Sequence, residues 1–209
     1  MYQPAHFAQA DPAAIRALMA THPLATLCHQ ADGGPTADHL PLLYDADAGP
    51  HGTLRGHVAR ANPLWRGAAG QTVLAIFHGP QGYVSPSWYP TKAATGKVVP
   101  TWNYAVVHAR GVLKAVDDAA WLRGLVDRLT RTHEGPRAQP WQTSDAPADY
   151  LQAMLRAIVG IEIEVVAIEA KWKVSQNRTA ADRDGVATGL AGETTAGAQA
   201  LATMVPVER

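Results

Sequence analysis

The sequence has no excess of charge of either sign and almost no cysteine. Lys plus Arg equals 18 and Asp plus Glu equals 18, so the formal net charge at pH 7 is zero. Dedicated DNA-binding domains usually carry a clustered basic excess, because neutralising phosphates drives their affinity. The residues themselves therefore do not support DNA as a partner. The single cysteine, Cys28, excludes an intramolecular disulfide, and its apolar run LATLCHQ indicates a buried, inert thiol.

Long hydrophobic runs and common catalytic motifs are missing as well. No run of 18 apolar residues occurs, and the opening MYQPAHF does not look like a signal peptide, so we expect no membrane and a cytoplasmic location. The motifs GxSxG and GxGxxG and the P-loop are missing, and we assign no catalytic residue. His39, His57, His78 and His108 are 18, 21 and 30 residues apart, which matches no metal signature, so we expect no metal.

The elements that the sequence does contain predict a mainly β protein with peripheral helices. Strands are expected at 24–30, 36–44, 53–58, 72–77, 83–88, 101–109, 111–116 and 160–168, with a turn at 78–82 and a loop at 91–97. Helices are expected after Asp11, Asp118 and Pro147. This order favours an antiparallel barrel over residues 1–178 with inserted helices. The Ala/Gly-rich residues 179–209 are expected to form a C-terminal tail of two helical pieces.

Two aromatic segments stand out, GYVSPSWYP at 82–90 and VPTWNY at 99–104. Aromatic rings beside hydroxyls and amides suit a flat, polar-edged ligand such as a flavin or a nucleobase. The alternative interpretation is a Tyr/Trp-rich strand pair inside a barrel, with proline at its edges.

Two further segments combine cations with hydrogen-bonding groups. GHVARANP brings His57, Arg60 and Asn62 to the start of a helical turn, which suits a phosphate cradle or a capped turn with a solvated Arg60. KWKVSQNR, at 171–178, places three cations around polar side chains. It suits an anion or the edge of a ring, or alternatively a charged strand exit into a capped helix.

Seven segments in order, MYQPAHF, HLPLL, GHVARANPLW, GYVSPSWY, VPTWNY, GIEIEV and KVSQNR, closely resemble the PaiB-type family of FMN-binding negative transcriptional regulators. The resemblance implies an FMN-binding split β-barrel, antiparallel and Greek-key-like, related to pyridoxamine-phosphate oxidases and flavin reductases. It implies a homodimer with FMN near the subunit interface, and repression of protease-production and sporulation genes. Pro86 and the long loop 90–98 depart from the family pattern.

The resemblance also implies roles for individual residues. His57, Arg60 and Asn62 would hold the phosphate, and His39 would line the isoalloxazine or ribityl side. Ring stacking and edge hydrogen bonds would come from Ser85, Ser87, Trp88, Trp102 and Asn103. The residues that reach the flavin of the partner subunit would be Lys173, Ser175, Gln176 and Arg178.

Three functions remain open at this point. The first is a flavin-binding regulator, in which FMN is sensed or structural and repression is direct or runs through a metabolite or partner. The second is a flavin-dependent oxidoreductase, similar to NAD(P)H:flavin reductases. We expect little such turnover, because no second phosphate site is visible. The third is a haem-handling split barrel, with a histidine on the iron.

Overall fold

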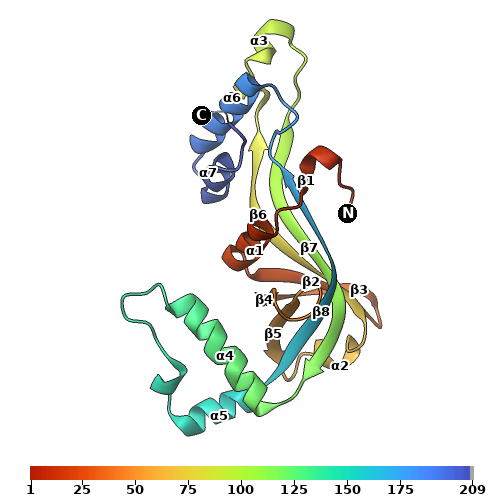
Figure 1. The fold of residues 1–209 in the computed structure, drawn as a ribbon, viewed down its shortest axis with the longest axis vertical. Helices are drawn as coiled ribbons and strands as arrows, with labels where there is room; N and C mark the ends of the chain where they lie inside the picture. Colours follow the sequence, from red (N-terminus) through yellow and green to blue (C-terminus); the bar gives the residue numbers. More distant parts are fainter. Residues whose placement is uncertain (208–209) are drawn as a thin grey trace. The chain divides into compact units, whose positions relative to one another are not determined.

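The computed structural model describes residues 1–207. These residues gather into two compact units, each built from separate stretches of chain. Unit 1 contains Met1–Leu18, His78–His108 and Glu169–Arg209, and unit 2 contains Met19–Phe77 and Ala109–Ile168. Figure 1 shows the elements of both units coloured along the chain.

An antiparallel sheet supplies most of the regular structure, as the sequence predicts. Neighbouring strands follow the order β3-β2-β6-β7-β8-β5-β4, and β1 pairs with β8. Three long strands, β6, β7 and β8, each contribute residues to both units. The bounds of the strands are β1 Ala8–Gln9, β2 Leu24–Ala31, β3 Gly34–Pro41, β4 Leu43–Asp45, β5 Thr53–Ala59, β6 Thr72–Val84, β7 Thr101–Val116 and β8 Ile158–Lys173.

In unit 2, a β2–β3 hairpin and the β4–β5 pair flank the long strands. Alternate residues are buried, including Leu54, Phe77 and Ile161, as expected where one face of a strand packs on a core. The helices of this unit are α2 Leu64–Gly67, α4 Ala119–Glu134 and α5 Ala148–Arg156, with the short 3-10 helix η3 Thr143–Asp145. Asp118 caps α4 by accepting a hydrogen bond from the Trp121 N–H at 2.7 Å, which confirms the predicted helix start.

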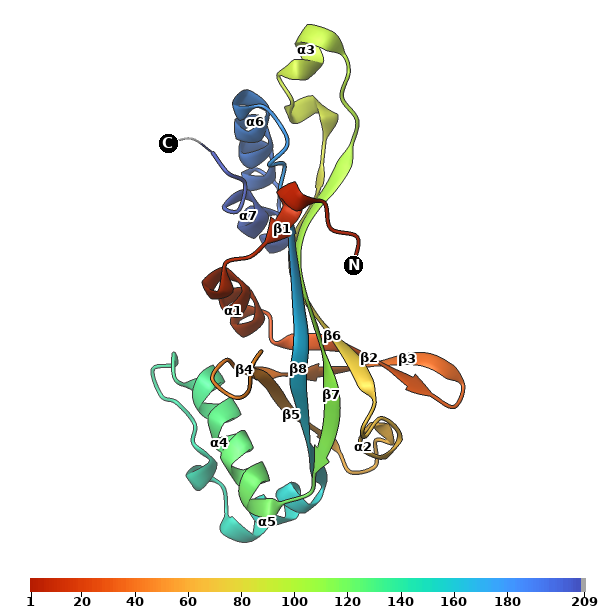
Figure 2. The same ribbon diagram turned by 45° about the vertical axis from the view of Figure 1, so that its right-hand side comes forward.

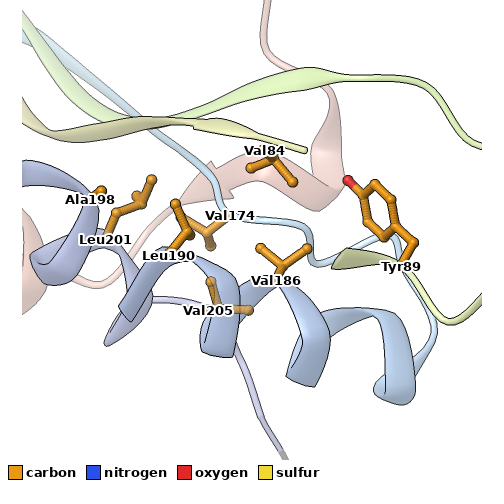
Figure 3. Close-up of a cluster of buried hydrophobic side chains, with 8 residues drawn as sticks. All are labelled: Val84, Tyr89, Val174, Val186, Leu190, Ala198, Leu201 and Val205. Atoms are coloured by element: carbon orange, nitrogen blue, oxygen red, sulfur yellow. The ribbon is translucent and has the colours of Figure 1, made fainter. Parts of the chain in front are cut away.

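In unit 1, helices α6 Ala180–Ala191 and α7 Ala196–Ala202 lie side by side (Figures 1 and 2). The prediction of two helical pieces after residue 179 is therefore confirmed. Figure 3 shows the buried cluster that they form with Val84 at the end of β6 and with the residues that follow η2 and β8: Val84, Tyr89, Val174, Val186, Leu190, Ala198, Leu201 and Val205. Residues 179–207 thus share a core with the rest of unit 1, although the sequence suggests a separate tail.

The remaining elements of unit 1 are short. They are η1 Ala5–Phe7, η2 Pro86–Trp88 and α3 Thr91–Thr95, and α1 Pro12–Thr21 begins in this unit. The helix α3 lies where the sequence suggests a loop, so that expectation is wrong. Among residues 1–207, no helix is both long and apolar enough to cross a bilayer.

The turn expected at 78–82 is also wrong, because β6 continues without interruption from Thr72 to Val84. Its glycines mark close packing instead of a turn. A β-carbon on Gly79 would lie 2.6 Å from a Leu18 methyl group, and one on Gly82 would lie 3.2 Å from Leu190. Glycine in a strand often marks such close approach.

Candidate functional site

Three of the motifs meet in unit 1. Asn103, from VPTWNY on β7, donates its amide hydrogen to the Ser175 hydroxyl, from KVSQNR, at 2.8 Å, and both residues are buried. Lys173 donates to the Trp102 carbonyl oxygen at 2.7 Å and to the Thr101 hydroxyl. The structure therefore brings together segments about 70 residues apart in the sequence.

Tyr89, from the SPSWY segment, joins the same group. The guanidinium of Arg178 lies 5.1 Å from the centre of its ring. Its hydroxyl is buried without a hydrogen bond, although Arg178 and Ser175 lie close enough to influence its pKa. Burial raises the pKa of Tyr89, so the phenol stays neutral. Sequence reasoning missed Tyr89, although it stands next to Trp88 in a motif already singled out.

Ser175 has an unusual backbone conformation. Its φ is +67°, and it is the only non-glycine residue with positive φ in the part of the chain that the structure describes. Its carbonyl oxygen accepts the Arg178 N–H at 3.0 Å, and the Gln176 side chain accepts the Val174 N–H at 2.8 Å. Left-handed backbone outside glycine is uncommon and concentrates at functional sites. The chain thus leaves β8 through a tight, hydrogen-bonded turn beside Asn103.

Positive charge accumulates around this turn. Lys171, Lys173 and Arg178 form no ion pair among residues 1–207. Burial, and then the charges of Lys171 and Arg178, lower the pKa of Lys173. The nearby carboxylate of Asp182 accepts hydrogen bonds from the Thr91 N–H at 3.1 Å and the Thr91 hydroxyl at 2.8 Å. This end of unit 1 is therefore suited to attract an anion.

Exposed aromatic rings lie on the neighbouring strands β6 and β7. Trp102 is 50% exposed and Tyr83 is 49% exposed, and their ring centres are 6.4 Å apart in an edge-to-face arrangement. The Trp102 indole N–H donates to Gln81 at 3.1 Å. Such a pair offers a flat apolar surface beside polar groups.

Trp88 and the two serines of its segment have structural partners. A β-carbon on Gly189 would lie 2.2 Å from the Trp88 indole, so this ring packs closely on α6. Ser85 caps η2 by accepting the Ser87 N–H at 3.2 Å. Ser87 accepts a hydrogen bond from Lys92 at 3.3 Å. Pro86 stands at the first position of η2, where a missing N–H costs little.

The residues expected to bind the phosphate lie in unit 2, and the side chains of Arg60 and Asn62 already have hydrogen-bond partners there. Arg60 donates to both carboxylate oxygens of Asp117, at 2.7 and 2.6 Å, and to the carbonyl oxygens of Arg156 and Ile158. Because charged hydrogen bonds of this kind are strong, the side chain is well held. This geometry corresponds to the capped-turn interpretation of GHVARANP, with Asp117 in addition.

Asn62 and the histidines of unit 2 complete this picture. Asn62 donates to Asp38 at 2.7 Å and accepts the Leu64 N–H at 2.8 Å, so it caps α2. His57 Nδ1 is buried without a partner, and burial lowers the pKa of His57, which favours the neutral ring. His39 is exposed on β3. No group of three or more potential metal ligands occurs among residues 1–207.

Sequence reasoning missed both carboxylates of this region. Asp117 lies 57 residues from Arg60 and Asp38 lies 24 residues from Asn62. No local spacing rule connects residues so far apart. Only the folded sheet, in which β7 and β5 are the two neighbours of β8, brings them together.

Comparison with known proteins adds relatives along the whole chain. Residues 1–167 match the family described as "Putative FMN-binding domain". The chain is 32% identical to "Protease synthase and sporulation protein PAI 2" of Bacillus subtilis, over 98% of this chain and 96% of that protein. An uncharacterised protein of Emericella nidulans is 33% identical over 98% of this chain and 96% of its own length.

Solved structures share the fold at low sequence identity. A FAD- and haem-binding protein from Mycobacterium smegmatis is 18% identical, with a TM-score of 0.59, over 79% of this chain and 73% of that one. The flavocytochrome Anf3 from Azotobacter vinelandii is also 18% identical, with a TM-score of 0.54, over 83% and 70%. The split-barrel fold expected from the sequence is thereby confirmed. With its family match and its relative in B. subtilis, the chain belongs to the PaiB-type family of FMN-binding split-barrel proteins.

Proposed function

We propose that this protein is a regulatory flavoprotein that binds FMN at a homodimer interface. The observation that carries the proposal is the meeting of three motifs in unit 1, where buried hydrogen-bonding groups lie beside Lys173 and Arg178. Neither cation forms an ion pair among residues 1–207, although the charge of Arg178 acts on the carboxylate of Asp182. FMN combines a flat ring with polar edges and a phosphate dianion, and this donor set fits both parts. When bound, FMN supplies a redox-active ring.

The contacts suggest a division of roles among these residues. Lys173 and Arg178 attract the phosphate or the polar edge of the ring on the partner subunit's FMN, with Ser175, Gln176 and Asn103 fixing the turn that carries them. Trp102 offers a ring to stack on, and Ser85 and Ser87 offer hydroxyls. Packing of Trp88 on α6 favours a supporting role for that indole.

The unit 2 group takes the phosphate only if the phosphate replaces carboxylates. Asp117 now holds Arg60 and Asp38 now holds Asn62. If the phosphate binds there, His57 and His39, also in unit 2, would face the ring or the ribityl chain of that FMN. The proposal therefore gives the greater share of phosphate binding to Lys173 and Arg178.

The regulatory part of the proposal rests on family membership. The B. subtilis relative is named for protease synthesis and sporulation. Helices α6 and α7 carry two acidic residues and one arginine, and the whole chain has no net charge, so we propose that negative regulation of transcription here is indirect. A gel shift with the promoter region of its own gene tests this part. Tight, competitor-resistant binding would contradict it.

A titration with FMN and riboflavin tests the flavin site. We expect FMN to bind more tightly than riboflavin. Lys173→Gln and Arg178→Gln should each weaken FMN by about 10-fold to 100-fold, the range of one charge-assisted hydrogen bond, with little effect on riboflavin. Lys114→Gln is the matched control, because Lys114 is exposed on β7 and pairs with Glu164.

The same titration on Arg60→Gln separates the two phosphate sites. If Arg60→Gln weakens FMN while Lys173→Gln and Arg178→Gln do not, the phosphate binds in unit 2 and the assignment to Lys173 and Arg178 is wrong. Equal affinity for riboflavin and FMN would contradict both sites. The absorbance spectrum of the purified protein distinguishes bound flavin from haem.

A further inference from the structure

A hollow of about 590 Å³ lies in unit 2, and none of the residues assigned to FMN above lines it. Its walls are one face of α4 from Arg123 to Glu134 and the chain that returns from it at residues 140–144. Ligand pockets in proteins usually measure about 300–1,000 Å³, so the size suits a small molecule.

Hydrogen bonds hold the two walls together. Thr143, which is buried, donates to Asp127 on α4. Arg123 donates to both oxygens of Asp127 at 3.1 Å and to the Thr143 hydroxyl at 3.2 Å. The backbone N–H of Trp141 donates to the Glu134 carboxylate at 3.1 Å. The hollow is therefore formed in advance of any ligand, which reduces the entropy lost on binding.

The charges around the hollow leave one cation without a partner. Asp127 is neutralised by Arg123, and Glu134 pairs with Arg137 at 3.0 Å. Arg131 also lines the hollow, and it forms no ion pair among residues 1–207. Its charge contributes to the lowered pKa of Asp127, after the Thr143 hydrogen bond and Arg123, so it lies near this polar floor. A guanidinium that forms no ion pair of its own suits one carboxylate.

An aromatic ring completes the hollow. Trp141 lines it and is 46% exposed, although large apolar side chains are usually covered. Threonine and serine hydroxyls at Thr130 and Ser144 lie in the same lining and can bond the rim of a ligand. A ring that contacts the indole would cover apolar surface that the folded chain leaves in water.

We propose that this hollow is a binding site for a planar aromatic carboxylate of one or two rings, whose ring packs on Trp141 and whose carboxylate pairs with Arg131. The site is independent of FMN and gives a flavin-binding regulator a second small-molecule input. The proposed ligand carries a single negative charge, which matches the one guanidinium of Arg131.

Calorimetric titration with 2-naphthoate and its uncharged analogue 2-naphthamide tests the site. We expect saturable binding of the acid and binding of the amide weaker by about 10-fold or more, because the amide lacks the charge. Arg131→Gln and Trp141→Ala should each weaken the acid by a similar factor, whereas Arg131→Lys and Trp141→Phe should keep part of the affinity. Arg156→Gln is the control, because Arg156 is exposed on α5 and does not line the hollow. Thermal unfolding of each variant confirms that it is folded.

Four results would overturn the proposal. They are no saturable binding of the acid at about 10 mM, equal affinity for acid and amide, no effect of Arg131→Gln in a folded protein, and displacement of the acid by FMN. The last result would mean that the flavin itself enters the hollow. Loss of acid binding with normal FMN binding would leave the flavin site proposed above intact, so the two proposals fail separately.

Discussion

In the buried pair of Asn103 and Ser175, Ser175 both accepts a hydrogen bond and has a strained backbone. The amide of Asn103 is 1% exposed and has the Ser175 hydroxyl as its acceptor, while Ser175 holds a left-handed backbone. A buried donor that loses its acceptor costs more than the net value of one hydrogen bond. The two effects can be separated by choosing which atoms of Ser175 to remove.

Ser175→Ala should lower the free energy of unfolding by about 1–3 kcal/mol, because it leaves the Asn103 amide without an acceptor and keeps a β-carbon at positive φ. Ser175→Gly removes the same hydroxyl but relieves roughly 1 kcal/mol of left-handed strain, so its loss should be smaller. Urea unfolding of both variants measures the difference. A glycine variant no more stable than the alanine variant would show that the backbone here carries no such strain.

His57 should make stability depend on pH in mildly acidic solution. Burial places its folded-state pKa below the usual value of 6.5, so as the pH falls below about 6.5 the unfolded chain takes up a proton first. The free energy of unfolding should therefore decrease as the pH is lowered through this window, and His57→Gln should make that decrease smaller. Unfolding curves between about pH 7 and pH 5 test this. The exposed His51→Gln is the control, and a profile unchanged by His57→Gln but altered by His51→Gln would contradict the assignment.

Regular elements follow from the sequence where local signals and packing agree. The α4 start at Asp118, the α1 start at Pro12 and the two C-terminal helices are all predicted, because capping residues and apolar periodicity act within one turn. The sequence does not predict that β6 and β7 run without interruption. For β6, the Gly-Pro-Gln-Gly run at 79–82 resembles a turn, and only the packing of α1, α6 and β7 against it explains why the strand continues. Glycine thus records close tertiary contact that no local rule reveals.

Two glycines in different elements should respond oppositely to alanine. A β-carbon on Gly111 in β7 would lie 2.3 Å from the Glu164 carbonyl oxygen on β8, so Gly111→Ala should destabilise the protein by about 1–3 kcal/mol or more. Gly124 lies within α4, and a β-carbon there would meet nothing within 4 Å. Gly124→Ala should therefore stabilise by roughly 1 kcal/mol. Denaturant midpoints with unchanged slopes measure both. A Gly111→Ala variant that is as stable as the original protein would contradict the strand contact, and a destabilised Gly124→Ala variant would contradict the open space in α4.

The candidate site was predictable in its motifs but not in its partners. VPTWNY and KVSQNR are recognisable from the sequence, and the sheet brings Asn103 beside Ser175. The ion pair of Arg60 with Asp117 was not predictable, because it depends on where β7 ends relative to the turn after β5. A cation near a helix start therefore predicts a phosphate site only where no carboxylate distant in the sequence pairs with that cation.

The whole molecule is expected to be a homodimer. Exposed side chains such as Trp102, Tyr83 and Val99 in unit 1 leave apolar surface that a second copy would cover. Obligate interfaces of this kind bury roughly 2,000 Å² or more in total. Light scattering should give twice the chain mass of 22.2 kDa at micromolar concentration. A stable monomer would contradict both the dimer and a flavin site completed by two subunits.

Rapid oxidation of NAD(P)H is not expected from the protein loaded with FMN. Hydride transfer requires a second pocket that holds the nicotinamide against the flavin. A steady-state assay with added FMN should therefore show only background rates. Turnover within the ordinary enzyme range of about 1–10³ s⁻¹ would make the oxidoreductase the leading function.

The interleaving of the two units along the chain has a consequence for synthesis on the ribosome. Unit 2 ends at Ile168, whereas unit 1 needs its first stretch, a middle stretch and everything from Glu169 onward. A nascent chain that has emerged as far as Ile168 holds all of unit 2, while the earlier pieces of unit 1 still lack α6, α7 and the turn at Ser175. Because domains tend to fold as units during translation, the segment that carries Lys173 and Arg178 is the last to join. The cofactor site assigned to unit 1 therefore cannot form until the stretch that begins at Glu169 has left the ribosome.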